Sequence, residues 1–406
     1  MVPNGWKKTH LKCVISGTIK NGYSPLPAST TTGYWVLSLG ALTDHGINPL
    51  EIKPVVVDEK VKQALLSDGD FLISRSNTPD KVGRSIRFKN EVQNCSYPDL
   101  MMRFCVDTQK ADPNFIEIKL KSTEVRQYYK SCAAGSSSSM VKINKAVVEN
   151  TPLLLPSFPE QKKIAQVLST WDRAISTTEQ LLANSQQQKK ALMQQLLTGK
   201  KRLLDNHGVR FSGEWRKVKV RDLIIQHSEK TDRNNQYPVL TSSRQGMLFQ
   251  KDYYNGRDVA SEDTTGYNVV PFGYFTYRHM SDDLNFSFNI NELCEKGIVS
   301  TLYPVFKAKE EEITPYLLRL ILNEGREFKH FSLAQKQGGS RTYMYLSKLQ
   351  ELKLNIPRLE EQQRIAAVLS TSEQEINALQ QKLDALKQEK KALMQQLLTG
   401  KKRVIV

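Results

Sequence analysis

The sequence predicts an α+β protein in which two globular domains alternate with two long helices that pair as an antiparallel coiled coil. Three observations indicate this fold class. A 14-residue segment occurs twice without a change, apolar residues around each copy recur at steps of three and four, and the two segments before these helices contain short strand-like runs. We therefore expect a tandem repeat with pseudo-two-fold symmetry.

The repeated segment is KKALMQQLLTGKKR, which spans Lys189–Arg202 and Lys390–Arg403. At the same offset of 201 residues, the motif P-x-x-x-E-Q-x-x-I-A begins at Pro156 and again at Pro357. Each half of the chain thus ends in the same element. We expect four parts, namely a first globular domain at 1–155, a central helical region at 156–205, a second globular domain at 206–356 and a C-terminal helical region at 357–406.

The helical regions have the periodicity of a coiled coil, because their apolar residues repeat every three or four positions. Pro159 suits the first turn of a helix, and Gly199 and Gly400 supply the stops, so each helix should run for about 39 residues, or ~58 Å. The first helix places Thr178, Ser185 and Lys189 on its seam, so its middle should be the weaker part. The apolar seam of the second helix comprises Ile365, Leu369, Ile376, Leu379, Leu383, Leu386, Leu393 and Leu397.

The globular segments differ in sequence, although each opens near a tryptophan, Trp6 in one and Trp215 in the other. Runs such as Phe71–Ser74 and Tyr274–Tyr277 predict strands, and 314–323 predicts a short helix. The aromatic residues at 272–277 alternate, so one face of that strand should be core, with a stacking platform for bases as the alternative. Each domain is expected to be mixed α+β.

The charge of the chain favours a polyanionic partner. Lys and Arg number 58 against 42 Asp and Glu, which gives a net charge of +16. Each of the four parts carries some of this excess, as expected for a long surface that follows a nucleic-acid backbone and not for a basic tail. Nucleic acid is therefore the leading partner, and an acidic membrane surface is the second.

Cysteine use and hydropathy indicate a cytoplasmic protein. The five cysteines are widely spaced and none forms a C-x-x-C pair, so neither a disulfide framework nor a zinc site is expected. The first residues lack the apolar core of a secretion signal, and the apolar runs are too short to span a membrane.

Matching helices between unlike globular domains are an unusual arrangement, and here the sequence resembles the specificity subunits of type I restriction-modification enzymes. The resemblance covers nearly the full length and is carried by the two P-x-x-x-E-Q-x-x-I-A motifs and the two L-L-T-G-K-K-R helix ends. Gly69–Asn77 is similar to a strand and loop of the family's first recognition domain. The second domain offers Thr241–Arg244, Gly297–Ser300 and Gly338–Arg341, whereas a serine run at Gly135–Ser139 replaces the G-S-x-R pattern in the first.

The resemblance implies a division of labour. This chain would bind double-stranded DNA and choose a bipartite target, two modification subunits would bring S-adenosylmethionine and methylate adenine, and restriction subunits would use ATP and Mg²⁺ to translocate and cleave. The sequence agrees, since it has no glycine-rich cofactor fingerprint, no N-P-P-Y or D-P-P-Y quartet and no G-x-x-x-x-G-K-[ST] loop. We expect no cofactor and no metal in this subunit.

Polar residues at loop tips are the candidates for DNA contact. Arginine can fork onto guanine and asparagine onto adenine, while serine and glycine let backbone approach a phosphate. The lysines and arginines at 200–202 and 401–403 are expected to contact DNA, to neutralise the carbonyls at the helix ends, or both. The candidates at loop tips are Arg75, Ser76, Asn77, Ser136, Ser137, Arg244, Gln245, Arg278, His279, Ser340 and Arg341.

Two other classes of protein fit part of the sequence. Asp99 with Glu117 and Lys119 matches the P-D…E-x-K spacing of a metal-dependent nuclease, in which two carboxylates hold Mg²⁺ and the lysine positions water. This pattern is short and has no equivalent in the second half. A coiled-coil structural protein would explain the helices but not two unlike domains with polar loop tips.

Overall fold

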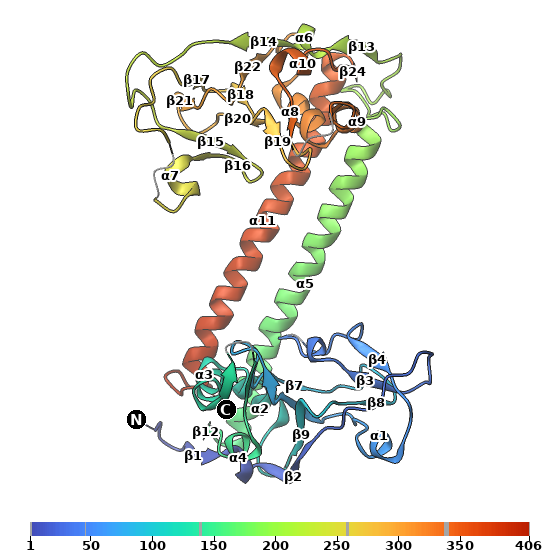
Figure 1. Ribbon diagram of the computed structural model, residues 1–406, viewed down its shortest axis with the longest axis vertical. Helices are drawn as coiled ribbons and strands as arrows, with labels where there is room; N and C mark the ends of the chain where they lie inside the picture. Colours follow the sequence, from blue (N-terminus) through green and yellow to red (C-terminus); the bar gives the residue numbers. More distant parts are fainter. Residues whose placement is uncertain (1, 45, 138–139, 257–259, 337–340, 406) are drawn as a thin grey trace. The chain divides into compact units, whose positions relative to one another are not determined.

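The computed structural model of the chain describes residues 2–44, 46–137, 140–256, 260–336 and 341–405 (Figure 1). They form two compact units, each with one globular domain and one part of each long helix. Unit 1 comprises residues 1–180 and 381–406, and unit 2 comprises residues 181–380. The long helices are α5 (Phe158–Leu196) and α11 (Leu359–Leu397), each of 39 residues as predicted.

Unit 1 is built around a four-stranded antiparallel sheet with the strand order β2-β9-β5-β7. Two three-stranded sheets, β4-β3-β8 and β10-β11-β6, and the strand pair β1-β12 complete it. The strands are β1 (Lys7–His10), β2 (Ile15–Asn21), β3 (Trp35–Leu37), β4 (Ile52–Pro54), β5 (Phe71–Ser74), β6 (Ser76–Asn77), β7 (Ser85–Arg87), β8 (Cys95–Ser96), β9 (Met101–Val106), β10 (Ala134–Ser137), β11 (Met140–Lys142) and β12 (Pro152–Leu155). The short helices are α1 (Glu59–Gln63), α2 (Pro113–Leu120), α3 (Thr123–Cys132) and α4 (Lys145–Glu149).

Unit 2 repeats this plan with a four-stranded sheet in the order β14-β22-β18-β20. Four further strand pairs, β13-β24, β15-β16, β17-β21 and β19-β23, surround it. The strands are β13 (Arg216–Lys219), β14 (Ile224–His227), β15 (Leu240–Ser243), β16 (Gly246–Phe249), β17 (Asn268–Pro271), β18 (Phe275–Thr276), β19 (Met280–Ser281), β20 (Asn289–Ile290), β21 (Lys296–Val299), β22 (Val305–Ala308), β23 (Thr342–Tyr343) and β24 (Lys353–Ile356). The short helices are α6 (Val220–Leu223), α7 (Gln250–Tyr253), α8 (Pro315–Glu324), α9 (Arg326–Ala334) and α10 (Leu346–Leu349).

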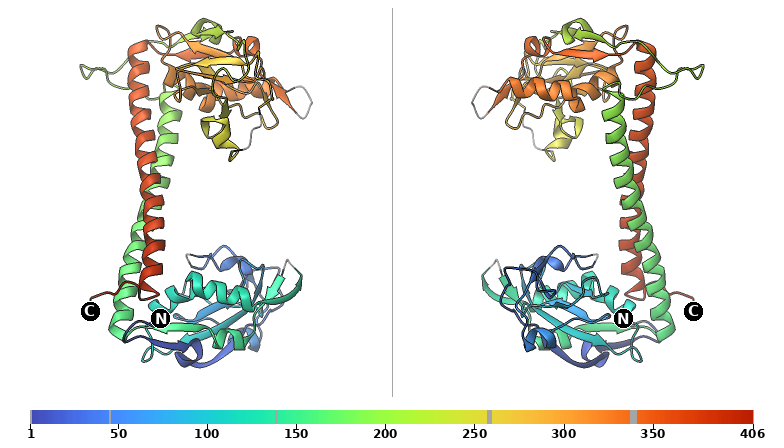
Figure 2. Two further views of the ribbon diagram at one scale, coloured as in Figure 1. Left: turned by 90° about the vertical axis from the view of Figure 1, so that its left-hand side faces the viewer. Right: turned by 90° about the vertical axis from the view of Figure 1, so that its right-hand side faces the viewer.

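The long helices contribute directly to the core of each unit. In unit 1, Ile164 and Leu168 of α5 and Leu397 of α11 are buried in one cluster with the sheet. In unit 2, Leu196 of α5 and Leu369 of α11 do the same. Within each unit the two helix parts lie side by side and antiparallel, as the views in Figure 2 agree. Each helix is therefore held both by its own globular domain and by the other helix.

The predicted secondary structure agrees with the observed elements in most places. The strand at 71–74 and the helix near 314–323 are both present, the latter as α8. The aromatic run at 272–277 forms a shorter strand than expected, because only Phe275 and Thr276 pair with neighbours. Phe275 and Tyr277 are fully buried, so this part of the run is core as expected, whereas Phe272 is exposed.

Two of the three polar positions on the α5 seam, Ser185 and Lys189, have partners on α11, whereas Thr178 bonds within α5. In unit 1, Thr178 is buried and its hydroxyl donates to the Ala174 carbonyl at 2.8 Å. In unit 2, Ser185 donates to Glu375 at 3.3 Å, and Lys189 lies 3.6 Å from the Glu373 carboxylate. The helices end as predicted, since Gly199 and Gly400 adopt φ values of 68° and 71°.

The structure explains the motif P-x-x-x-E-Q. In unit 1 the Gln161 side chain donates to the Pro156 carbonyl at 3.0 Å and accepts from the Asp112 backbone N–H at 2.9 Å, just before α2. In unit 2 Gln362 makes the equivalent bonds to Pro357 and Thr314, at 3.0 and 3.1 Å. The glutamine therefore fixes the start of each long helix to its globular domain.

The glutamate of the same motif forms an ion pair that we call the clasp. In unit 1, Arg403 donates to both oxygens of the buried Glu160 at 2.6 and 2.8 Å, and its guanidinium lies 5.7 Å from the Trp6 ring. The Trp6 indole also donates to Glu160 at 3.1 Å. Bidentate contact and an aromatic face are the geometry that favours arginine over lysine.

Unit 2 has the matching clasp between Arg202 and Glu361, with bonds of 2.6 and 2.7 Å. The guanidinium lies 5.8 Å from the Trp215 ring, so the two tryptophans noted in the sequence play the same part. One difference separates the clasps, because the Trp215 indole N–H is buried without a hydrogen-bond partner among the described residues. Glu361 therefore depends more heavily on its arginine than Glu160 does.

In the described part of the chain, no helix is long and apolar enough to cross a membrane. The five cysteines are unpaired.

Candidate nucleic-acid interface

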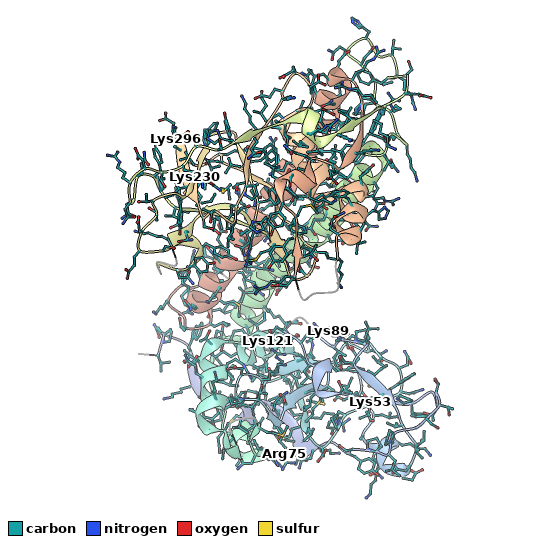
Figure 3. The ribbon with its side chains drawn as sticks, turned by 45° about the horizontal axis from the view of Figure 1, so that its top comes forward. Lys53, Arg75, Lys89, Lys121, Lys230 and Lys296 are labelled. Atoms are coloured by element: carbon teal, nitrogen blue, oxygen red, sulfur yellow. The ribbon has the colours of Figure 1, made fainter. Side chains whose placement is uncertain are left out.

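The first candidate segment follows β5 in unit 1 and comprises Arg75 and the short strand β6, which carries Ser76 and Asn77. The backbone of Arg75 is fixed on both sides, since its N–H donates to the Leu100 carbonyl at 2.8 Å and its carbonyl accepts from Ile143 at 2.9 Å. Among the described residues its guanidinium is hydrogen-bonded only to the Asp99 carbonyl, at 3.5 Å, which leaves most of its donors available. Figure 3 labels Arg75 on unit 1. This is a side chain on a rigid base with free hydrogen-bonding capacity.

The two neighbours of Arg75 are placed differently. Ser76 is 1% exposed and its hydroxyl has no hydrogen-bond partner among the described residues, so it faces the interior and not a surface that DNA would approach. Asn77 is half-buried and donates to the Ser74 hydroxyl at 3.3 Å. Ser136 and Ser137 lie on β10, which pairs with β11, but their side chains fall outside the described residues, and so does all of Ser340.

In unit 2 the fold brings two predicted arginines, Arg244 and Arg341, to one turn, and Arg278 lies a few residues before that turn in the sequence. Arg278 follows β18 and is exposed, and β19 comes two residues later. The pairing of β19 with β23 sets Ser281 opposite Thr342, so Arg341 adjoins the same segment. Arg244 arrives from the turn of the β15-β16 hairpin, with Gln245 beside it.

Two consecutive aspartates bind two of these arginines. Arg341 donates to Asp282 at 3.0 Å, and Arg244 pairs with Asp283. Asp283 also accepts from the Ser281 hydroxyl at 3.0 Å and from Asn285, through its side-chain amide at 3.0 Å and its backbone N–H at 3.2 Å. Asn285 first, and then Arg244 and Ser281, lower the pKa of Asp283. We call residues 281–285 the aspartate turn.

An aromatic group borders the aspartate turn, and two of its members, Tyr343 and Tyr345, were not predicted from the sequence. His279 is only 9% exposed, and its ring stacks on Tyr345 with a centroid distance of 5.0 Å. Tyr345 in turn stacks on Tyr343 at 5.9 Å, and both tyrosines are exposed. The alternation Tyr343-Met344-Tyr345, with Met344 fully buried, is the signal that would have indicated an exposed aromatic face beside Arg341.

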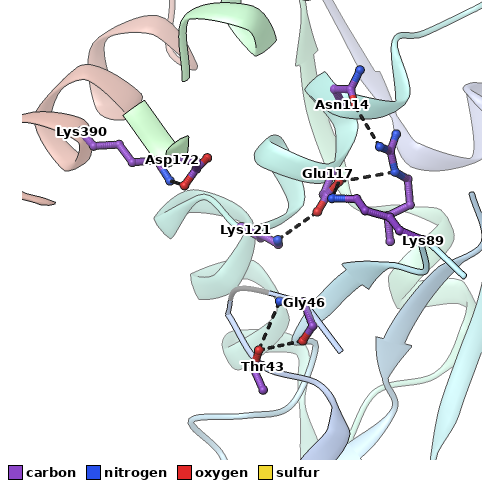
Figure 4. A network of polar contacts seen from close by, with 9 residues as sticks. Thr43, Gly46, Lys89, Asn114, Glu117, Lys121, Asp172 and Lys390 are labelled. Atoms are coloured by element: carbon purple, nitrogen blue, oxygen red, sulfur yellow. Dashed lines mark hydrogen bonds and ion pairs between the residues drawn. The ribbon is translucent and has the colours of Figure 1, made fainter. Parts of the chain in front are cut away.

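The residues of the nuclease pattern have other partners. The Glu117 carboxylate lies 3.5 Å from both Arg87 and Lys89 and 3.1 Å from Lys121 (Figure 4). Lys119 is fully buried and donates to Glu124 at 2.7 Å and to the Leu398 carbonyl at 3.1 Å. Among the described residues no group of three or more His, Cys, Asp or Glu side chains has the arrangement of a metal site.

Comparison with known proteins agrees with this architecture. The sequence model of the family described as type I restriction modification DNA specificity domain matches residues 57–184 and 213–388. The two matches cover more than half of the chain, and the first contains much of one globular domain while the second contains the other. The chain belongs to the type I restriction-modification DNA specificity family, and it carries two specificity domains in tandem.

Relatives in the same family come from Methanocaldococcus jannaschii. The specificity subunit of type I restriction enzyme MjaVIII is 25% identical over 312 residues, which are 71% of this chain and 70% of that protein. A protein assigned to enzyme MjaX as its specificity subunit is 22% identical over 199 residues, 48% of this chain. The chain spans about half the length of that relative, 46%.

Solved structures share the fold. The S subunit of a type I restriction-modification system from M. genitalium has a TM-score of 0.58 at 13% identity, with 97% of this chain and 96% of that chain covered. A chain from a study of the assembly and conformational transition of the type I system has a TM-score of 0.53 at 14% identity, with 98% of each chain covered. The predicted combination of two α+β domains with two long helices is therefore confirmed.

Proposed function

We propose that this chain is the DNA-reading subunit of a type I restriction-modification complex and that each globular domain reads one half of a bipartite target. The observation that carries this proposal is the contrast between the repeated and the unrepeated parts. The arginine–glutamate pairs of the clasps, the helix ends and the contacts of Gln161 and Gln362 with their prolines recur in both units, whereas the loops differ, with Arg75 in one and the aspartate turn in the other. A common scaffold with two different loop sets suits two different half-sites.

The proposal assigns no chemistry to this chain. Glu117 is surrounded by three cations and Lys119 is buried, so neither has the freedom that metal-dependent hydrolysis needs. In this proposal two modification subunits bind S-adenosylmethionine, and restriction subunits bind ATP and Mg²⁺. Candidate DNA contacts are Arg75, Asn77, Arg244, Gln245, Arg278, His279 and Arg341, together with the exposed Tyr343 and Tyr345.

A domain duplication within the chain tests the two-reader proposal. Residues 216–356 are replaced by residues 7–155, so that β1 and β12 take the places of β13 and β24 while Arg202, Trp215 and Glu361 stay. Co-expression with the modification subunits, followed by mapping of methylated adenines through single-molecule sequencing, should show a target in which the first half-site occurs twice. The reciprocal duplication is the matched control and should double the other half-site. A variant that keeps the original two half-sites would refute the proposal.

The partner proposal needs a separate test. Lys190, Gln194 and Gln195 on α5 and their counterparts 201 residues later are exposed and identical, so two copies of one partner would meet the same surface. Truncation after Pro357 removes one copy of this surface. We expect the truncated chain to bind one modification subunit, or to pair with a second truncated chain. A truncated monomer that still binds two copies, by native mass spectrometry, would contradict the proposal.

A further inference from the structure

The aspartate turn contains a conflict of charge that DNA binding alone does not explain. Arg244 and Arg341 are candidate DNA contacts, yet each is paired with an aspartate. All four side chains are about half exposed or more, between 46% and 69%. Ion pairs with this exposure add little to the stability of a fold. A reason other than stability is therefore needed for two carboxylates on this surface.

The turn is also organised more tightly than an ordinary surface loop. Asp283 receives hydrogen bonds from Ser281 and Asn285 in addition to its arginine, so its carboxylate is fixed before any ligand arrives. Leu284 has a φ of 66°, which is the left-handed region that bulky residues avoid. Strain of this kind persists only where the surrounding contacts enforce it.

We propose that Asp282 and Asp283 are specificity-determining residues that hold Arg341 and Arg244 in neutral pairs and thereby weaken binding to DNA of the wrong sequence. This inference rests on the proposed function, since it assumes that unit 2 reads DNA. The physical reason is that a phosphate brings a negative charge, which the aspartates repel. A base edge carries only partial charges, so the aspartates repel it less. An arginine can therefore leave its aspartate for a base at a smaller electrostatic cost than for a phosphate.

The first domain offers a comparison within the same chain. The Arg75 guanidinium has no carboxylate partner among the described residues and meets only a backbone carbonyl. Its charge is therefore available to any phosphate. If the inference holds, unit 1 contributes more to sequence-independent attraction, and unit 2 contributes more to discrimination between the target and other DNA.

The test uses Asp283→Asn and Asp282→Asn in the complete complex with the modification subunits. Asparagine keeps an oxygen that accepts from Ser281 and Asn285 but removes the charge. Binding is measured by fluorescence anisotropy on the mapped target duplex and on a scrambled duplex of the same composition, over a range of NaCl concentrations. Each variant should bind the scrambled duplex about eight-fold tighter near ~0.1 M salt and steepen the salt slope by about 0.9, the effect of one additional phosphate contact. Affinity for the target should change less, so the specificity ratio should fall.

Two controls separate charge release from general electrostatics. Asp263→Asn removes an exposed carboxylate of the same unit that accepts a hydrogen bond from Thr265 and pairs with no arginine among the described residues, so it should leave the slope unchanged. Adding Arg244→Gln to Asp283→Asn should abolish the gain on scrambled DNA.

The results also separate this inference from the proposed function. An unchanged salt slope in the variants, or a gain on scrambled DNA that survives Arg244→Gln, would overturn the inference. The proposed function would still stand if the wild-type complex selects its target. A wild-type complex that prefers no target would refute both.

Discussion

The clasp of unit 2 should be more sensitive to loss of its arginine than the clasp of unit 1. The perturbations are Arg202→Met and Arg403→Met, which keep most of the side-chain volume and remove the guanidinium. Both glutamates are 2% exposed, so each variant leaves a carboxylate in the interior. Glu160 then retains the bond from the Trp6 indole at 3.1 Å, whereas Trp215 donates no bond to Glu361.

The expected magnitude follows from these contacts. Removing one partner of a buried ion pair costs about 3–5 kcal/mol because the other charge stays buried. Glu361 lies in the first turn of α11, where the helix dipole stabilises its negative charge by about 0.3–1 kcal/mol. Arg202→Met should therefore destabilise unit 2 by about 2–4 kcal/mol. The effect of Arg403→Met on unit 1 should be smaller, because a hydrogen bond to a charged group such as Glu160 contributes about 1.5–3 kcal/mol.

Hydrogen exchange with mass spectrometry measures the two units separately, which a single melting curve of a two-unit chain does not do. Peptides from β14 and β22 report on unit 2, and peptides from β5 and β9 report on unit 1. Adding Glu361→Gln to Arg202→Met is the control, since removal of the buried charge should restore much of the stability. Equal losses in the two units, or a larger loss in unit 1, would refute the reasoning about the indole.

Three further outcomes are expected. Arg278→Ala should weaken DNA binding. If Arg278 contacts a base, the loss should be roughly 1–3 kcal/mol and specificity should relax at one target position, and if it contacts a phosphate, the salt slope should fall by about one. Unchanged binding would show that Arg278 is not part of the interface. Asp99→Ala with Glu117→Ala should leave cleavage by the DNA-bound complex intact, and Mg²⁺-dependent nicking by this subunit alone that the double variant loses would reverse that conclusion. Cys13 and Cys105 are both exposed residues. Hydrogen bonds from Thr9 and the His10 backbone lower the pKa of Cys13, while partial burial of the thiol and its hydrogen bond to Asp70 raise the pKa of Cys105 to about 11. At pH 8 iodoacetamide should therefore alkylate Cys13 far faster, and the rate at Cys105 should rise with pH up to about pH 11, as mass spectrometry of digests would show.

The scaffold was predictable because its signals are long and periodic. A helix of 39 residues offers many apolar positions, and an unchanged segment at a fixed offset identifies the repeat without knowledge of the fold. The strand at 272–277 was less predictable, since Phe275, Thr276 and Tyr277 are all buried in succession, which breaks the expected alternation. Tertiary packing decides such short runs.

The candidate interface was predictable in its residue types but not in its grouping. Arg244, Arg278 and Arg341 were all identified at loop tips, yet the contacts of Arg341 with Asp282 and of Arg244 with Asp283 join residues 59 and 39 positions apart. Ser76 appeared equivalent to Arg75 in the sequence, but the side chains of adjacent strand residues point to opposite faces, and Ser76 is buried. Asp282 and Asp283 were not predicted as site residues, because the sequence around them does not indicate that Arg341 and Arg244 are their partners.

The two clasp arginines come from identical sequence segments, and this has a consequence for recombination between genes of such chains. The segment 189–202 and its copy at 390–403 supply both clasp arginines, and they do so with the same fourteen residues. A crossover between genes within this segment would exchange one globular domain for another and leave the arginine, the helix end and the glycine stop unaltered. A single recombination event thus yields a protein that keeps the helices and clasps of the parent chain but carries the loops of a different globular domain.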